Sequence, residues 1–147
     1  EISCSLVGSE MCIRDRNGEP LSAVADKWSM PAWVEDLCGW LRFLAYESDA
    51  SGVLHLCQSG EPVSWHGYAV TALKCAVKHG LLPSLPPVAE QKLDEQAGFR
   101  DARPRHTAMS CERLASLMKR PVRTYEEAID LAVARYASDP TFLSRIS

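Results

Sequence analysis

Cysteine and histidine are the residues of this chain whose chemistry could include metal binding or redox reactions. The chain has six cysteines and four histidines, and no two cysteines form the Cys-x-x-Cys pair of zinc ribbons and thiol oxidoreductases. The histidines are scattered at separate places along the chain. We therefore expect no metal site and no redox motif among the residues that follow the first sixteen, which are Cys38, Cys57, Cys75, Cys111, His55, His66, His79 and His106.

These four cysteines have a simpler interpretation as small hydrophobic residues. Cys38 and Cys75 fall on the apolar stripes of two expected helices, where a free thiol packs much as a small aliphatic side chain does. We expect the thiols to be reduced, buried and unreactive. Reduced cysteines are typical of cytoplasmic proteins, and a cytoplasmic location is the corresponding expectation.

The first sixteen residues have a separate origin in our interpretation. Leu6–Arg16 reads LVGSEMCIRDR, which resembles a translated transposase sequencing adapter, and the five residues before it fit the same adapter. The alternative is a short natural peptide or a signal segment, but no cationic start and no apolar run of signal-peptide length precede it. We therefore expect Glu1–Arg16 not to be native sequence and not to pack into the fold, so that the native part is residues 17–147.

The charge balance argues against two classes of protein. The whole chain has a formal net charge of −3, and without the charged residues of Glu1–Arg16 the net charge is −2. Such a mildly acidic surface does not suit a dedicated nucleic-acid binder or a membrane-surface protein. No apolar run approaches the roughly 20 residues of a membrane span. We therefore expect neither a nucleic acid nor a membrane as a partner.

Hydrophobic spacing predicts alternating strands and helices over the first half of the native part. Leu21–Ala25 is a short apolar run that predicts a buried strand, and Val53–Cys57 predicts a second one. Two helices are expected, over Trp33–Glu47 and over Trp65–His79, the latter with Ser64 as its N-cap. The apolar stripe expected for the first helix consists of Val34, Leu37, Cys38, Leu41, Leu44 and Ala45.

The second half is less regular. Gly80 suits a helix end, the three prolines of Leu81–Pro87 predict an irregular segment, and Val88–Pro104 gives little indication of structure. Ser110–Met118 predicts a short helix. A last helix follows Thr124, whose side chain forms a capping-box pattern with the glutamate three residues later.

Two strands are too few for a sheet of their own. We therefore expect a piece of a larger α/β protein whose strands complete a sheet made elsewhere. In the piece alone, Leu21–Ala25 would be an unpaired strand edge, which favours aggregation.

Three stretches carry a resemblance to a known family: ADKWSMPAWVEDLCGWL, GVLHLCQSGEPVSWHGYAV and RPRHTAMSCERLASLMKRPVRTYEEAIDLAV. In this order they resemble the dTDP-4-dehydrorhamnose reductase family, whose patterns include Asp-Gln-x-Gly-x-Pro-Thr, Ser-Gly-x-x-Ser-Trp and Arg-Pro-x-x-Ser-x-Leu. The resemblance covers Asn17 to about Tyr136. The positions that match the family patterns are Asp26, Pro31, Asp36, Leu37, Gly52, His55, Ser59, Gly60, Ser64, Trp65, Ala69, Arg103, Pro104, Thr107, Met109, Leu114 and Glu127–Ile129.

The resemblance implies the C-terminal, substrate-binding part of an extended short-chain dehydrogenase, an α/β protein that is helix-rich with a few short strands. Family members bind NADPH at a glycine-rich turn of a Rossmann-type domain and protonate the carbonyl with a Tyr-x-x-x-Lys pair. This chain has no such turn, and none of its four tyrosines has a lysine four residues later. We therefore expect the NADPH-binding and catalytic half to lie upstream, and this chain to be inactive by itself.

The same resemblance implies a dTDP-sugar held between the two halves. Two phosphates call for cationic donors, and Arg103 and Arg105, which flank Pro104, are the expected ligands because a guanidinium binds phosphate oxygens in pairs. The alternative for both is a solvated loop charge.

Two further candidates lie before the first expected helix. Lys27 stands where the family usually has glutamine, and it could contact substrate or pair with Asp26 or Asp36. Trp28 could wall a sugar pocket, as could Trp33, although an aromatic residue before a helix is also typical of a core. Further departures from the family pattern, at Ser29 and Ala32, leave the sugar specificity open, and Trp65 is expected in the core.

The implied function is NADPH-dependent reduction of the C4 ketone of dTDP-4-dehydro-L-rhamnose, a step toward cell-surface polysaccharide, and the resemblance allows a homodimer of the full-length protein. One alternative is another extended short-chain dehydrogenase, such as a nucleotide-sugar epimerase or dehydratase. A second is a non-catalytic regulatory subunit on the same fold, like the methionine adenosyltransferase β subunit. A third is a helix-turn-helix DNA binder, because Gly18–Leu41 superficially resembles a phage terminase small subunit; the net charge and the expected strands count against it.

Overall fold

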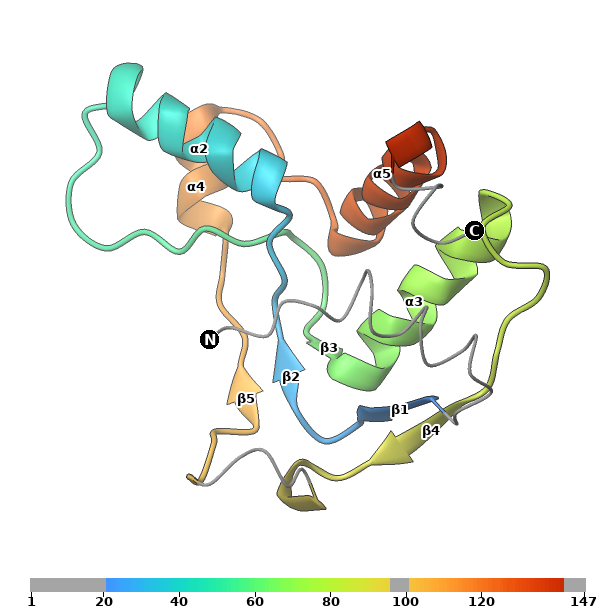
Figure 1. Cartoon of the computed structure of the whole chain (residues 1–147). Coiled ribbons are helices and arrows are strands. Elements are labelled where there is room, and N and C mark those ends of the chain that lie inside the picture. The colour runs from blue at the N-terminus through green and yellow to red at the C-terminus, as the bar shows by residue number, and fades with distance from the viewer. Residues whose placement is uncertain (1–20, 96–100, 142–147) are drawn as a thin grey trace.

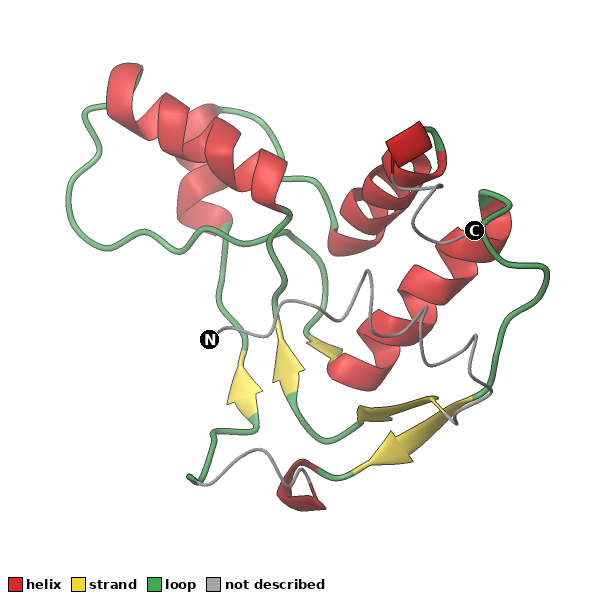
Figure 2. Ribbon diagram, viewed as in Figure 1, coloured by secondary structure: helices red, strands yellow, loops and turns green. Residues whose placement is uncertain are grey.

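The computed structural model describes residues 21–95 and 101–141, so the expectation for Glu1–Arg16 falls outside the described residues. The described part is a mixed α/β structure with short strands (Figures 1 and 2). Its elements in chain order are β1 (Leu21–Val24), β2 (Trp28–Ser29), α2 (Val34–Tyr46), β3 (Val63–Ser64), α3 (Trp65–Lys78), β4 (Val88–Gln91), the 3-10 helix η2 (Leu93–Glu95), β5 (His106–Thr107), α4 (Glu112–Met118) and α5 (Tyr125–Ala137).

The strands form two small sheets. β1 pairs in parallel with β4, and α3 contacts both strands of this pair. In the second sheet β2 lies between β3, which is antiparallel to it, and β5, which is parallel. The expectation that Leu21–Ala25 would be an unpaired edge is therefore wrong, because the uninformative stretch Val88–Pro104 contains its partner strand.

Two separate hydrophobic clusters hold the helices together. In the first, α2 packs against α4 and the segment after it through Trp40, Leu114 and Val122. In the second, α3 packs against α5 through Ala72, Ile129 and Val133. Figure 1 shows these two helix pairs at opposite sides of the molecule, with the three-stranded sheet below the space between them. The packing of the two helices within each pair is therefore set by that pair's own core.

The α3–α5 pair also carries a polar clamp. The Asp130 carboxylate of α5 accepts hydrogen bonds of 2.7 and 2.8 Å from Lys78 Nζ at the end of α3, and His79 Nε2 lies 2.9 Å from the same carboxylate. The Lys78 ammonium holds the pKa of the Asp130 carboxyl below its usual range. Since the Lys78 side chain is largely exposed, the clamp orients the helices more than it stabilises them.

The helix ends agree with the sequence signals. The Ser64 hydroxyl accepts a hydrogen bond of 3.0 Å from the Gly67 amide at the start of α3. Thr124 and Glu127 form both halves of the capping box at the start of α5. Gly80 follows α3 with a φ of +75°, a left-handed conformation that residues with a Cβ adopt at a cost. These three predictions are confirmed.

The apolar stripe expected for α2 is only partly confirmed, because Leu37 packs against the first hydrophobic cluster while other members of the stripe are exposed. Trp40, which was not part of that stripe, is 5% exposed and fills the contact with α4, whereas Val34 and Leu41 are 63% and 52% exposed. Cys38 is exposed as well, so it is not the buried thiol that was expected. The large indole buries more surface than the smaller side chains, and the helix is rotated to place it inside.

The strand expected over Val53–Cys57 is also wrong, because this segment is irregular. Val53 is 77% exposed, and its carbonyl accepts a hydrogen bond of 2.8 Å from Arg113 of α4 instead of from a neighbouring strand. The same guanidinium binds the Ser51 carbonyl at 2.6 Å. The apolar run is therefore a loop whose last residues, Leu56 and Cys57, pack inward.

A buried glutamine connects this loop to the two helix pairs. Gln58 is 1% exposed, and its amide oxygen accepts a hydrogen bond of 3.3 Å from the backbone N–H of Trp33. Its amide nitrogen donates to the Asp36 carboxylate at 2.9 Å and to the Arg123 carbonyl at 3.2 Å. Arg123 in turn donates hydrogen bonds of 2.8 and 2.9 Å to Asp36. The start of α2 and the approach to α5 are therefore joined through one side chain.

We expect the substitution Gln58→Ala to lower the free energy of unfolding by about 2 kcal/mol or more. It would leave a buried N–H and a buried carbonyl without their partner, and each unmade hydrogen bond of this kind costs about 1–3 kcal/mol. Urea denaturation followed by circular dichroism measures the effect. The exposed Glu61→Ala, three residues along the chain, is the matched control and should stay within about 0.5 kcal/mol of the unchanged chain. Equal effects of the two substitutions would contradict the role of Gln58.

Candidate functional site

Pairing of β2 with β5 brings together two segments that are far apart in the sequence. Trp28 is in register with His106, and Ser29 with Thr107. The Trp28 amide donates a hydrogen bond of 2.7 Å to the Arg105 carbonyl, and the Thr107 hydroxyl donates one of 3.2 Å to the Trp28 carbonyl. The four expected substrate ligands, Lys27, Trp28, Arg103 and Arg105, therefore lie on these two adjoining segments.

Arg105 is held by carboxylates of the protein itself. Its Nε donates to Asp26 at 3.0 Å, and its terminal nitrogen donates to Asp94 of η2 at 2.8 Å. Asp26 also accepts a hydrogen bond of 2.7 Å from the Leu93 amide, and this bond together with Arg105 holds the pKa of the Asp26 carboxyl below its usual range. Arg105 thus fastens β5 and η2 to the end of β1, and its expected contact with a phosphate stays a prediction.

Lys27 is an unusual cation because it is 7% exposed. Its Nζ donates a hydrogen bond of 2.7 Å to the Pro104 carbonyl and lies 5.7 Å from the centre of the Trp65 ring, within range of a cation–π contact. Burial, and secondarily the charge of Arg103, lowers the pKa of the Lys27 ammonium. The expected pairing with Asp26 or Asp36 is not observed, because these carboxylates bind Arg105 and Arg123.

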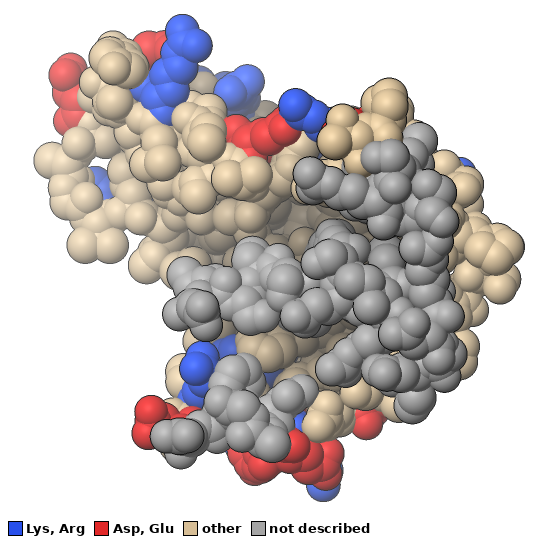
Figure 3. All heavy atoms as spheres, viewed as in Figure 1, with Lys and Arg blue, Asp and Glu red and all other residues tan. Residues whose placement is uncertain are grey.

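Arg103 and Lys27 belong to neighbouring segments, and the charge of Arg103 contributes to the lowered pKa of Lys27. Arg103 is exposed and precedes the proline whose carbonyl Lys27 binds. In Figure 3, basic and acidic side chains lie side by side at the end of the molecule that carries η2 and β5, without a large patch of one sign. The local pair of cations is therefore a small feature in a mixed surface.

Two aromatic rings stack next to these cations. The Trp28 and His106 rings have centroids 4.7 Å apart and planes inclined by 10°. Their parallel stacking follows from the strand register, since residues opposite each other in paired strands project from the same face. Trp28 therefore contributes to an aromatic stack at the sheet, and His106, which the sequence offered only as a scattered histidine, is its second member.

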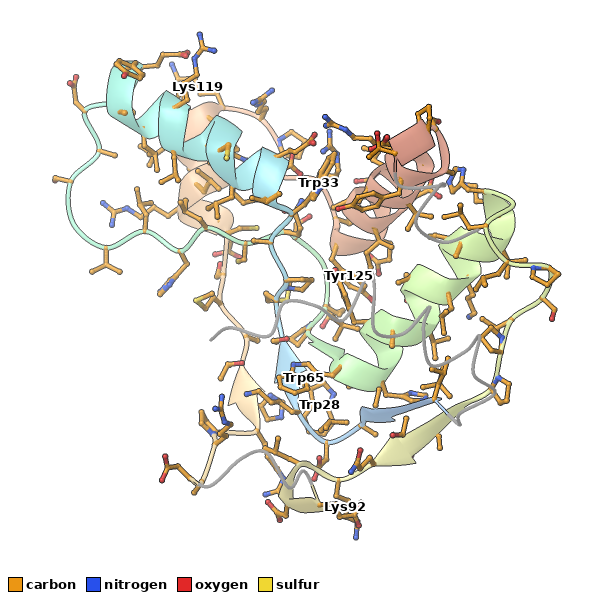
Figure 4. All side chains as sticks on the ribbon, in the orientation of Figure 1. Trp28, Trp33, Trp65, Lys92, Lys119 and Tyr125 are labelled. Atoms are coloured by element: carbon orange, nitrogen blue, oxygen red, sulfur yellow. The ribbon has the colours of Figure 1, made fainter. Side chains whose placement is uncertain are left out.

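A cleft of about 380 Å³ lies elsewhere, between the start of α2 and helices α3 and α5. Trp33 lines it together with three tyrosines, Tyr68, Tyr125 and Tyr136, while Trp28 does not. Burial raises the pKa of Tyr125 to about 12, so its hydroxyl stays protonated at neutral pH. Figure 4 shows Trp33 and Tyr125 at this cleft, away from Trp28 and Trp65 near the base of β2. The cleft is mostly apolar, and its walls are aromatic.

The thiols and imidazoles do not form a reactive centre in the part that the structure describes. Burial raises the pKa of Cys57 to about 11 and also raises that of Cys75, so both stay protonated at neutral pH. Within residues 21–95 and 101–141, no three histidine, cysteine or acidic side chains gather as metal ligands would. None of the helices in these ranges is long and apolar enough to cross a membrane.

Comparison with known families agrees with the motif resemblance. The sequence model of the family described as RmlD substrate binding domain matches residues 7–138 of the chain. The chain belongs to this family. No curated protein sequence shows a significant match to this chain.

The fold of this RmlD substrate binding domain is also found in a solved structure. The crystal structure of dTDP-4-dehydrorhamnose reductase from Bacillus anthracis str. Ames, in complex with NADP, is similar with a TM-score of 0.61 at 22% sequence identity. The similarity covers 82% of this chain and 40% of the reductase chain, so this chain spans well under half of that protein. The predicted α/β class, as the substrate-binding part of a reductase fold, is confirmed.

The acid stability of the domain should depend on Asp26. Its pKa is lowered in the folded state, so its contribution to stability is complete above the pKa of the unfolded chain and is lost as the pH falls below about 4. Asp26→Asn should therefore be less stable than the unchanged chain at pH 6 and should lose less on acidification to pH 3. Thermal unfolding at the two pH values measures this. Asp49→Asn, at an exposed position, is the control; a similar pH dependence in both variants would count against the Asp26 network.

Proposed function

We propose that this chain is the nucleotide-sugar-binding part of an NADPH-dependent reductase that acts on a 4-keto sugar such as dTDP-4-dehydro-L-rhamnose. The observation that carries the proposal is the family match over residues 7–138. The solved reductase of similar fold supports the activity, and the NADP in that structure supports the cofactor. In this proposal the cofactor and the catalytic groups belong to a part of the protein that this chain does not include.

The arrangement of cations supports the substrate class. We propose Lys27 and Arg103, on either side of the Pro104 carbonyl that Lys27 binds, as the diphosphate ligands, and Arg105, which binds Asp26 and Asp94, as a group that positions this segment. Lys27 has no carboxylate within salt-bridge distance among the described residues, and its charge is partly desolvated. A diphosphate beside these two cations would form charge-assisted hydrogen bonds and relieve their mutual repulsion. Trp28 would then lie beside the diphosphate, close to either the sugar or the nucleoside of the ligand.

We expect the chain to bind dTDP, and the affinity to depend on Arg103. Loss of one charge-assisted contact of about 1.5–3 kcal/mol in Arg103→Ala should raise the Kd roughly ten- to hundredfold. Isothermal titration calorimetry measures the Kd, and added salt should weaken the binding further. Arg42→Ala, which removes an exposed arginine from α2, is the matched control and should leave the Kd unchanged. An unchanged Kd in Arg103→Ala would remove Arg103 from the site.

The proposal also predicts that this chain does not bind NADPH. Pyrophosphate binding in such enzymes uses backbone amides of a glycine-rich turn at a helix start, and the sequence contains none. Titration with NADPH followed by its fluorescence should show no saturation, while circular dichroism shows helical structure. Saturable micromolar binding of NADPH would show that the cofactor site had been misplaced.

A further inference from the structure

The stacked rings of Trp28 and His106 have a feature that the core does not explain. Both hydrophobic clusters of the described part lie elsewhere, between the helices of each pair. His106 is nevertheless exposed, and its ring is held flat against Trp28 at a centroid distance of 4.7 Å. One face of the imidazole contacts the indole, so the opposite face is the one that solvent or a ligand can reach.

The strand backbone fixes the orientation of this ring. His106 is in β5, whose register with β2 places it opposite Trp28, and the Thr107 hydroxyl binds the Trp28 carbonyl at 3.2 Å. The Arg105 carbonyl on the other side of His106 accepts the Trp28 amide hydrogen at 2.7 Å. Arg105 is itself anchored by Asp26 and Asp94. An exposed aromatic ring that is fixed in this way requires little further ordering when a ligand binds.

Cationic groups lie at a suitable separation from the ring. Arg103 is three residues before His106, so their Cα atoms are at most roughly 10 Å apart at the rise of an extended chain. Lys27 directly precedes Trp28. It binds the carbonyl of Pro104, which lies between Arg103 and His106 in the sequence. A flat ring with two cations on adjoining residues, one of them within this limit along the chain, is complementary to a nucleotide, in which the ribose separates the base from the phosphates.

We propose that the exposed face of His106, backed by Trp28, is the stacking surface for the base of the bound nucleoside diphosphate. This inference rests on the proposed function and assigns the base to a place that the family match does not specify. Stacking of a base on an aromatic side chain is favourable for every base, because each has a π-face. The surface therefore sets the position of the nucleoside without selecting thymine by its edges.

The test compares dTDP with inorganic pyrophosphate, using the whole chain and calorimetry. His106→Ala should weaken dTDP binding about tenfold or more and leave pyrophosphate binding unchanged, because only dTDP has a base to stack. His106→Phe keeps a flat ring and should bind dTDP as the unchanged chain does. Trp28→Leu should also weaken dTDP binding selectively, since the imidazole loses its backing. His55→Ala, at an exposed histidine of the loop after α2, is the matched control.

The outcomes separate this inference from the proposed function. If His106→Ala weakens both ligands equally, or if His106→Phe behaves as His106→Ala does, stacking is excluded while the diphosphate site stands. Unchanged dTDP binding in His106→Ala would likewise exclude stacking and leave the diphosphate site in place. Absence of dTDP binding in the unchanged chain overturns the proposed function and this inference together. Circular dichroism of each variant verifies that the fold is kept, and UDP should bind about as tightly as dTDP.

Discussion

The side-chain amide of Gln58 is the constraint on which the arrangement of the helices depends. An amide buried to this degree must satisfy its oxygen and both of its N–H groups within the protein, and Gln58 does so with Trp33, Asp36 and the Arg123 carbonyl. The backbone of Ser59 adds hydrogen bonds to Arg123 and Tyr125. Because these partners come from the start of α2 and the approach to α5, the two helix pairs cannot shift independently. The aromatic cleft, which Gln58 also lines, has its shape for the same reason.

Asp26 has the corresponding role at the sheets. Its two carboxylate oxygens bind the Leu93 amide and Arg105, so that η2 and β5 are attached to the end of β1. Both hydrophobic clusters are small, and neither contains a residue of β2 or β5. The position of Trp28 and His106 is therefore set by polar contacts and strand register, with little contribution from apolar burial. This dependence explains why a surface ion pair, which is usually worth little, matters for the candidate site.

The sequence predicted what is periodic or local. The apolar spacing located α2, α3 and α5, and the caps at Ser64 and Thr124 followed from contacts within a single turn. The two-residue strands could not be found in this way, because pairing of β2 with β5 joins residues more than 70 positions apart. For the same reason the ion pair of Arg105 with Asp26, 79 residues away, could not be predicted from the sequence. The motif resemblance supplied the family, which periodicity could not.

The contrast between Arg105 and Lys27 bears most directly on the proposed site. Arg105 is neutralised by two carboxylates, and its pKa is raised by them. Lys27 is buried beside a carbonyl and an indole, and the nearby Arg103 charge lowers its pKa further. A partly desolvated ammonium next to a second cation is unfavourable in the ligand-free protein, and an anion is the group that would relieve it. The family pattern that this segment resembles has a neutral glutamine at this position, where this chain has the charged Lys27. In the proposed function, Lys27 therefore increases the preference of the site for a doubly charged phosphate group without contributing to recognition of the base.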